Sequence, residues 1–169
     1  HLAQVARTGM GPVDILMNNA GVVLRGALEQ IAMAEWEWSF GINVLGVIHG
    51  IRAFLPQMIA RGSGYIINTA SIAGLVALTG EGAPYIASKF AVVGLTEALH
   101  RELAPLGIGV SALCPMIVDT RINENSARMR PAELRNDREL TLPSAATMAG
   151  GTIPAEEVAR RVVRAIERK

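Results

Sequence analysis

The chain has 169 residues, which is enough for one domain with a hydrophobic core and too few for two ordinary domains. Half of the residues are hydrophobic and 18% are charged, and 16 basic and 15 acidic side chains give a formal net charge of +1. This balance excludes a disordered chain and gives no support to nucleic-acid binding. The single cysteine, Cys114, has no partner for an internal disulfide. A reducing compartment is therefore favoured, and we expect the protein in the cytoplasm.

The predicted elements alternate between short apolar strands and helices with apolar residues three and four positions apart. In chain order they are the tail of a helix at 2–7, a strand at 14–18, a helix at 34–61, a strand at 65–70, a loop at 71–82, a helix at 84–104, a strand at 108–114 and a helix at 154–168. Gly62 is placed to end the first long helix, and Pro84 suits the first turn of the second. Continuous apolar strands separated by helices predict an α/β fold, in which helices cover both faces of a parallel sheet.

Two stretches need separate interpretation. Residues 44–60 are the most apolar part of the chain, but His49, Arg52 and Pro56 interrupt the run of about 20 apolar residues that a membrane span requires. We therefore expect a buried helix and no membrane contact. Residues 121–152 are polar, with arginines interleaved among acids, so we expect a solvated surface excursion there.

Polar residues follow each predicted strand at its carboxyl end, where open α/β sheets bind ligands. The turn 18–21 follows the first strand, Ser71 follows the second, and the segment 115–120 follows the third. Tyr85 and Lys89 begin the helix after the second loop, and their spacing of four places both side chains on one helix face. We expect all of these groups to lie along one edge of the sheet.

The pair Tyr85 and Lys89 has a chemical interpretation beside a structural one. A free tyrosine has a pKa of about 10, so an ammonium held close favours the phenolate and makes it a usable general base. Ser71 can hydrogen-bond a substrate oxygen as charge develops there, and hydride transfer would need a cofactor. Taken singly, the pair also fits a helix-face contact, Ser71 an ordinary loop hydroxyl, and Asn18 and Asn19 a polar turn.

Five motifs in order make the chain resemble the short-chain dehydrogenase/reductase family. They are Asn18-Asn19-Ala20-Gly21, Asn43-Val44-Leu45-Gly46, Ser71, Tyr85-Ile86-Ala87-Ser88-Lys89, and the segment from Pro115 to Thr120. The resemblance covers nearly the whole chain. It implies a Rossmann-like doubly wound parallel sheet, here partial with three core strands, in a single domain over residues 1–169.

The resemblance also implies an oxidoreductase that interconverts an alcohol and a ketone or aldehyde. Tyr85 would be the general acid and base, Lys89 would lower its pKa and hold the nicotinamide ribose, and Ser71 would orient the substrate oxygen. Asn43 would anchor a water that continues a proton relay through Lys89. Residues 121–152 would form the mobile substrate lid.

The cofactor implied by the resemblance is NAD or NADP. Asn19, Ala20 and Gly21 would approach it by backbone, where glycine permits close contact. Val118 and Thr120 would contact the nicotinamide carboxamide and the diphosphate. The full set assigned to cofactor binding is Asn19, Ala20, Gly21, Tyr85, Lys89, Pro115, Val118 and Thr120.

Two features depart from the family pattern. Met116 stands where the family usually has glycine after Pro115, and this side chain would narrow the nicotinamide pocket or alter the turn. A glycine-rich diphosphate loop between a strand and a helix is absent, because Gly9-Met10-Gly11 precedes a strand instead of following one. We therefore expect the family's first strands, about two βαβ units, to lie upstream of His1 and the chain to be a fragment.

Other interpretations stay open. The chain is either an active oxidoreductase or a catalytically silent fragment or interaction module, and sugar-nucleotide epimerases and dehydratases share the Tyr/Lys pair. The expected partners are a small-molecule alcohol or carbonyl substrate and further copies of the chain, in a homodimer or homotetramer formed through helices 34–61 and 84–104. Leu75, Val76, Leu78 and Met148 hint at a hydrophobic substrate. We expect no metal site, since His49 and His100 lack ligands at suitable spacing.

Overall fold

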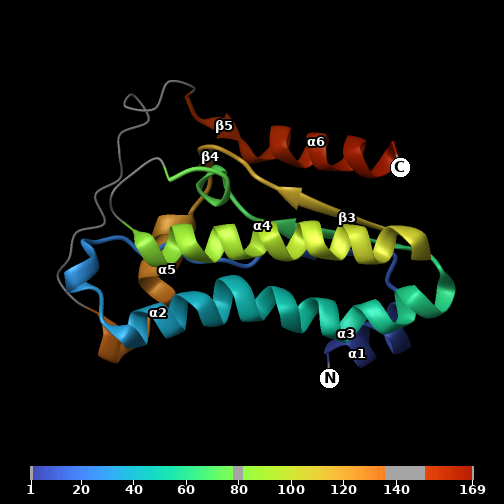
Figure 1. The fold of residues 1–169 in the computed structure, drawn as a ribbon, viewed down its shortest axis with the longest axis horizontal. Coiled ribbons are helices and arrows are strands. Elements are labelled where there is room, and N and C mark those ends of the chain that lie inside the picture. Colours follow the sequence, from blue (N-terminus) through green and yellow to red (C-terminus); the bar gives the residue numbers. More distant parts are fainter. Residues whose placement is uncertain (1, 78–81, 136–150, 169) are drawn as a thin grey trace.

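The computed structural model describes residues 2–77, 82–135 and 151–168 (Figure 1). Its α-helices are α1 (Leu2–Met10), α2 (Met33–Phe40), α3 (Gly46–Arg61), α4 (Ala83–Leu103), α5 (Ile122–Met129) and α6 (Ala155–Glu167). Its strands are β1 (Ile15–Asn18), β2 (Gly64–Thr69), β3 (Ile108–Leu113), β4 (Val118–Asp119) and β5 (Ile153–Pro154). Short 3-10 turns lie at Leu28–Gln30, Ile72–Gly74, Ala104–Leu106 and Ala132–Leu134.

Three of these strands form one parallel sheet in the order β1-β2-β3. Ile15 is paired with Tyr65, and Tyr65 with Gly109, so the strands run in register and their carboxyl ends reach the same edge. We call this edge, which follows Asn18, Thr69 and Leu113, the carboxyl edge. The predicted α/β fold with three parallel core strands is confirmed, and each core strand lies within one residue of its predicted bounds.

One face of the sheet carries the hydrophobic core against α3 and α4. The side chains on this face alternate along each strand with those on the other face, as the pleat of a strand requires. The buried cluster consists of Val47, Ile51, Met58, Ile66, Ala70, Val92, Leu99, Leu103, Ile108 and Val110. These contacts fix the position of α4, whose first turns bear Tyr85 and Lys89.

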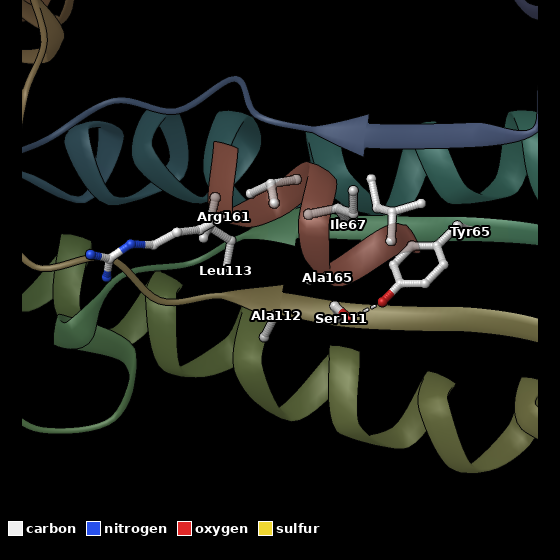
Figure 2. Close-up of a pocket in the computed structure, with 9 residues that line it drawn as sticks. Tyr65, Ile67, Ser111, Ala112, Leu113, Arg161 and Ala165 are labelled. Carbon is white, nitrogen blue, oxygen red and sulfur yellow. Dashed lines mark hydrogen bonds between the residues drawn. The ribbon is translucent and has the colours of Figure 1, made fainter. Parts of the chain in front are cut away.

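The opposite face is covered unevenly. Helix α6 lies against β2 and β3, as the close-up in Figure 2 shows, and β4 pairs with β5 in a small parallel sheet beside it. On β1, however, Ile15 and Met17 remain 47% and 43% exposed. The prediction that the first strand is buried on both faces is therefore wrong for the described residues, because nothing among them covers this face of β1.

The first predicted long helix is continuous from Met33 to Arg61 but is not uniform. A turn of π-helix at Gly41–Leu45 joins α2 to α3, and the Gly46 N–H donates to the Gly41 carbonyl across it. The helix ends at Gly62, which takes the left-handed conformation with φ 65°. By length and composition this is the one described helix that could cross a membrane. Only 28% of its most apolar window is buried, and the buried residues of α3 are Val47, Ile51, Phe54 and Met58. The expectation of a buried helix therefore holds for one side of the helix only.

Candidate active site

The segments after the three strands are hydrogen-bonded to one another along the carboxyl edge. The Thr69 hydroxyl donates to Asn19 Oδ1 at 3.2 Å, which joins the turns after β1 and β2. The Ile72 N–H donates to the Pro115 carbonyl at 2.9 Å, which joins the segments after β2 and β3. The expected meeting of these segments at one edge is confirmed, since parallel strands bring their carboxyl ends together.

Tyr85, Ser71 and Lys89 meet at this edge. The Ser71 side chain hydrogen-bonds the Tyr85 phenol, and it also accepts the Ala73 N–H at 3.2 Å, so its orientation is fixed from both sides. Lys89 Nζ lies 5.6 Å from the centroid of the Tyr85 ring, as their spacing of four on α4 predicts. Tyr85 is half-buried and Ser71 is buried, so both hydroxyl groups are partly shielded from water.

Lys89 is also tied to the sheet. Its side chain is only 3% exposed, and Nζ donates to the Thr69 carbonyl at 2.9 Å. Burial lowers the pKa of Lys89 to about 8, and the neighbouring Cys114 thiol opposes this shift. Near neutral pH the buried amine is therefore still charged, but it loses its proton far more readily than a lysine in water.

The pKa of Tyr85 differs from the expectation based on Lys89. Burial raises the pKa of the phenol, while the hydrogen bond from Ser71 and the positive charge of Arg25 lower it. The desolvation of the phenolate thus outweighs its favourable interactions in the protein without cofactor. The expected lowering of the Tyr85 pKa by Lys89 is not what this structure gives.

Asn43 lies in the π turn with 1% of its surface exposed and is fully used in hydrogen bonds. Its Oδ1 accepts the Val22 N–H at 2.8 Å, and its Nδ2 donates to the Val22 carbonyl at 2.9 Å and to the Ser88 hydroxyl at 3.0 Å. The side chain thereby fixes the loop after β1 against α4. The water relay through Asn43 stays a prediction.

Gly21 is enclosed by the candidate catalytic side chains. A Cβ at this position would lie 3.3 Å from Asn43 Oδ1 and 3.5 Å from Lys89 Nζ. A Cβ here would be tight against Asn43 and in ordinary contact with Lys89, so glycine keeps the backbone close to both groups. Of its predecessors in the motif, Asn19 and Ala20 are exposed on the carboxyl edge.

Asn18 serves the sheet instead. Its Nδ2 donates to Asn68 Oδ1 at 2.8 Å, and Asn68 Nδ2 donates to the Thr96 hydroxyl at 3.0 Å. The hydroxyl of Thr96 in turn donates to the Val92 carbonyl at 2.6 Å. This chain of buried polar groups links β1, β2 and α4 directly beneath the site, which supports the structural interpretation of Asn18.

The segment after β3 contains the remaining predicted cofactor residues. Pro115 accepts the hydrogen bond from Ile72, Val118 begins β4, and Thr120 is exposed just beyond it. Met116 is 44% exposed, and the described chain has no residue other than glycine with positive φ. The methionine therefore replaces the family's glycine without backbone strain.

The polar segment from 121 onward is not simply a solvated surface. Residues 122–129 form α5, and its Ser126 is buried and accepts the Val23 N–H at 2.9 Å. Arg130 is buried as well and forms an ion pair with buried Glu35 of α2. The prediction of a solvated surface is therefore wrong for Ser126 and Arg130. Each is buried because the fold provides a polar partner, a hydrogen bond for the Ser126 hydroxyl and an ion pair for the Arg130 charge. Residues 136–150 of the predicted lid, with Met148, lie outside the described residues, as does Leu78.

Sequence reasoning missed Arg25 altogether. It follows the buried run Val22, Val23 and Leu24, and its positive charge acts on the Tyr85 phenol. Its Nε is buried without a hydrogen-bond partner. One feature of the sequence could have indicated it. Arg25 is a single basic residue, and it directly follows the apolar run 22–24 after the turn 18–21.

A cavity of about 210 Å³ lies on the other face of the sheet, between β2, β3 and α6. Figure 2 shows Tyr65, Ile67, Ser111 and Arg161 around it. The Tyr65 hydroxyl and Ser111 Oγ are hydrogen-bonded at 2.7 Å. None of the predicted site residues lines this cavity. Among the described residues there is also no group of three His, Cys, Asp or Glu side chains suited to a metal ion.

Known proteins match both the sequence and the fold. The family model of the short chain dehydrogenases matches residues 1–131. The ketoacyl reductase HetN of Nostoc sp. strain PCC 7120 is 34% identical over 175 residues, which cover 99% of this chain and 53% of that protein. The chain spans about half the length of the curated relatives it matches.

Two solved structures agree with this assignment. A short chain dehydrogenase/reductase from Burkholderia phymatum in complex with NAD has a TM-score of 0.85 and 40% identity, over 99% of this chain and 62% of that one. A gluconate 5-dehydrogenase from Burkholderia cenocepacia J2315 in complex with NADP and tartrate has a TM-score of 0.68 and 33% identity, over 78% and 51% of the two chains. The chain belongs to the short-chain dehydrogenase/reductase family.

Proposed function

We propose that this chain carries the catalytic residues of an NAD- or NADP-dependent oxidoreductase that interconverts an alcohol and a ketone or aldehyde. The observation that carries the proposal is the hydrogen bond between Ser71 and the Tyr85 phenol, with Lys89 Nζ 5.6 Å from the phenol ring. A hydroxyl donor and an ionisable phenol on one edge can together hold and protonate a single substrate oxygen.

In the direction of reduction, Tyr85 Oη gives its proton to the carbonyl oxygen as negative charge develops there. Ser71 Oγ donates a hydrogen bond to the same oxygen and keeps it in line with the phenol. Because burial raises the pKa of Tyr85, the neutral phenol that this step requires is the stable form near neutral pH. In the direction of oxidation, the phenolate takes the alcohol proton instead.

Lys89 and Asn43 support these groups. The Lys89 ammonium stabilises the phenolate when it forms and carries protons between Tyr85 and the buried polar groups behind it. Asn43 holds the Val22 backbone and thereby keeps Gly21 against Lys89. We propose Asn43 as the anchor of a proton relay that continues from Lys89.

The residues on the carboxyl edge fit a nicotinamide cofactor. Gly21 has no side chain between its backbone and Asn43 or Lys89, so its backbone is open to close approach by a cofactor. The backbone of Asn19, Ala20 and Gly21, the side chains of Tyr85 and Lys89, and the segment with Pro115, Val118 and Thr120 would hold it. When bound, the nicotinamide supplies the hydride that no side chain carries. NAD and NADP are bound in the two related structures, which supports either cofactor here.

The substrate would lie beside Ser71 and Tyr85, under a lid formed by residues 121–152. Leu75 and Val76 are exposed next to the site, which favours a substrate with an apolar part. The whole chain would act as a single domain.

The test is to measure NADH and NADPH binding and the turnover of an alcohol and ketone panel with the purified protein. Binding with turnover supports the proposal. Binding of either nucleotide without turnover of any panel member would contradict it. If neither NADH nor NADPH binds, a catalytically silent member of the family is favoured. A nucleotide that copurifies with the protein would instead favour an epimerase or dehydratase.

A further inference from the structure

The loop that bears Arg25 is held in place on both sides of that residue. On one side, Asn43 bonds the N–H and the carbonyl of Val22, and Ser126 accepts the Val23 N–H. On the other side, the Gly26 carbonyl accepts the Gly82 N–H at 3.3 Å. The backbone at position 25 is therefore fixed by three different parts of the fold.

This loop places Arg25 beside the first turn of α4. A Cβ on Gly82, the residue before the helix, would lie 3.8 Å from both Cα and Cγ of Arg25. Tyr85 is three residues further along, and the Arg25 charge acts on its phenol. Arg25 thus approaches Tyr85 from the loop after β1, whereas Lys89 approaches it from within α4.

The guanidinium of Arg25 has no counter-ion among the described residues. None of the ion pairs between them includes it, and its Nε is buried without a hydrogen-bond partner. Arg25 is partly buried, whereas the fully buried Arg130 is paired with Glu35. A buried donor without a partner is costly, and a planar guanidinium matches a carboxylate with two parallel hydrogen bonds.

We propose that Arg25 binds a carboxylate group of the substrate, so that the preferred substrates are hydroxy acids and the corresponding oxo acids. This inference rests on the proposed oxidoreductase function and assigns its substrate class. Ser71 and Tyr85 hold the reacting oxygen, and Arg25 holds the acid group at the other end of the same molecule. Binding of the carboxylate would explain why the basic Arg25 follows the apolar residues Val22, Val23 and Leu24 at the site.

The first test compares oxo acids of increasing chain length with their methyl esters and amides, using the same reduced cofactor. We expect kcat/KM for the best oxo acid to exceed that of its methyl ester and amide by about 10- to 100-fold, the range of one charged hydrogen-bonded pair. Arg25→Gln should bring the ratio of kcat/KM for the acid to kcat/KM for its ester close to one. This ratio is the readout, because the substitution also removes a positive charge that acts on Tyr85 and so affects all substrates alike. Arg25→Lys should keep part of the preference, because it keeps the charge and loses the planar fork.

The control is Arg164→Gln, which removes the same charge from the exposed surface of α6. It should leave the acid preference unchanged. Equal use of acids, esters and amides by the native protein, or an acid preference that survives Arg25→Gln, would overturn the Arg25 inference while the oxidoreductase function stands. Absence of turnover with every acid, ester and amide would instead contradict the proposed function.

A second readout needs no turnover. The chain has two tyrosines, so in a Tyr65→Phe background the ultraviolet signal of the phenolate reports on Tyr85 alone. Acetate and propionate, bound at Arg25, would neutralise its charge and raise the Tyr85 pKa further, and Arg25→Gln should remove this response to the added carboxylate. A response to acetate that is the same in both variants would overturn the assignment.

Discussion

The amide group of Asn18 lies so close to Gly50 of α3 that a Cβ at position 50 would come within 2.2 Å of Asn18 Oδ1. Since Asn18 also donates to Asn68, its side chain has little freedom to move away. The glycine therefore lets α3 pack against β1 directly beside the polar groups under the site.

Gly50→Ala should lower the free energy of unfolding by about 1 to 3 kcal/mol, because the added methyl group forces Asn18 or the helix to shift. Gly94→Ala in α4 is the matched control, since a Cβ there meets no atom within 4 Å. This second change should instead stabilise the protein by about 0.5 to 1 kcal/mol, because alanine favours the helix. Denaturant unfolding measures both, and equal effects of the two substitutions would contradict the packing described here.

Asn43→Ala should destabilise the protein as well as impair activity. The substitution leaves the Val22 N–H and carbonyl buried without their partner, at a cost of about 2 kcal/mol or more. The control is Asn125→Ala, which makes the same substitution at an exposed position of α5. Its free energy of unfolding should stay within about 0.5 kcal/mol of the native value. A native-like unfolding midpoint for Asn43→Ala would show that the Val22 loop does not depend on this side chain.

The buried amine of Lys89 predicts a specific dependence of stability on pH. Its pKa is about 8 in the folded protein and ordinary when unfolded, so between about pH 8 and 10 the unfolded chain binds more protons than the folded one. Stability contributed by this group therefore rises with pH across that window. Compared with Lys89→Met, the native protein should gain free energy of unfolding from pH 8 to pH 10.

The pKa itself can be read by NMR of side-chain-labelled lysine, because the sequence contains only Lys89 and Lys169. The signal that disappears in Lys89→Met belongs to Lys89 and should titrate near pH 8. A titration at the ordinary lysine value of about 10.4 would contradict the burial of the charged amine.

The helices of the predicted oligomer interface carry exposed apolar side chains. Leu45 in the π turn, Ile59 near the end of α3, and Phe90 of α4 are each more than two fifths exposed. Burying such side chains against a second copy would stabilise a dimer or tetramer. We expect Phe90→Asp to reduce the oligomer to monomers in light scattering. A native protein that is already monomeric at micromolar concentration would contradict the predicted assembly.

Much of this fold follows from local sequence patterns. The apolar strands, the helical periods, Gly62 and Pro84 locate the core elements because each signal acts within a few residues. Tyr85, Ser71 and Lys89 could be grouped in advance because parallel strands bring their carboxyl ends to one edge.

Contacts between distant segments were not predictable in the same way. Ser126 bonds Val23 across 103 positions of sequence, and Arg130 pairs with Glu35 across nearly as many, so no local pattern connects them. The polar composition of their segment indicated solvent, whereas the fold supplies buried partners. The direction of the Tyr85 pKa likewise depends on how much water the folded site excludes.

The most direct test of the proposed chemistry compares the two tyrosines of the chain. Tyr85→Phe removes the proposed acid and base, whereas Tyr65→Phe makes the same change on β2, away from the carboxyl edge. With the best substrate of the panel, Tyr85→Phe should lower kcat by about 100- to 10,000-fold, and Tyr65→Phe should keep native turnover. Cofactor affinity should fall far less than kcat in Tyr85→Phe, because the aromatic ring, Lys89 and the backbone contacts remain. Native-like turnover by Tyr85→Phe would contradict the catalytic role on which the whole account rests.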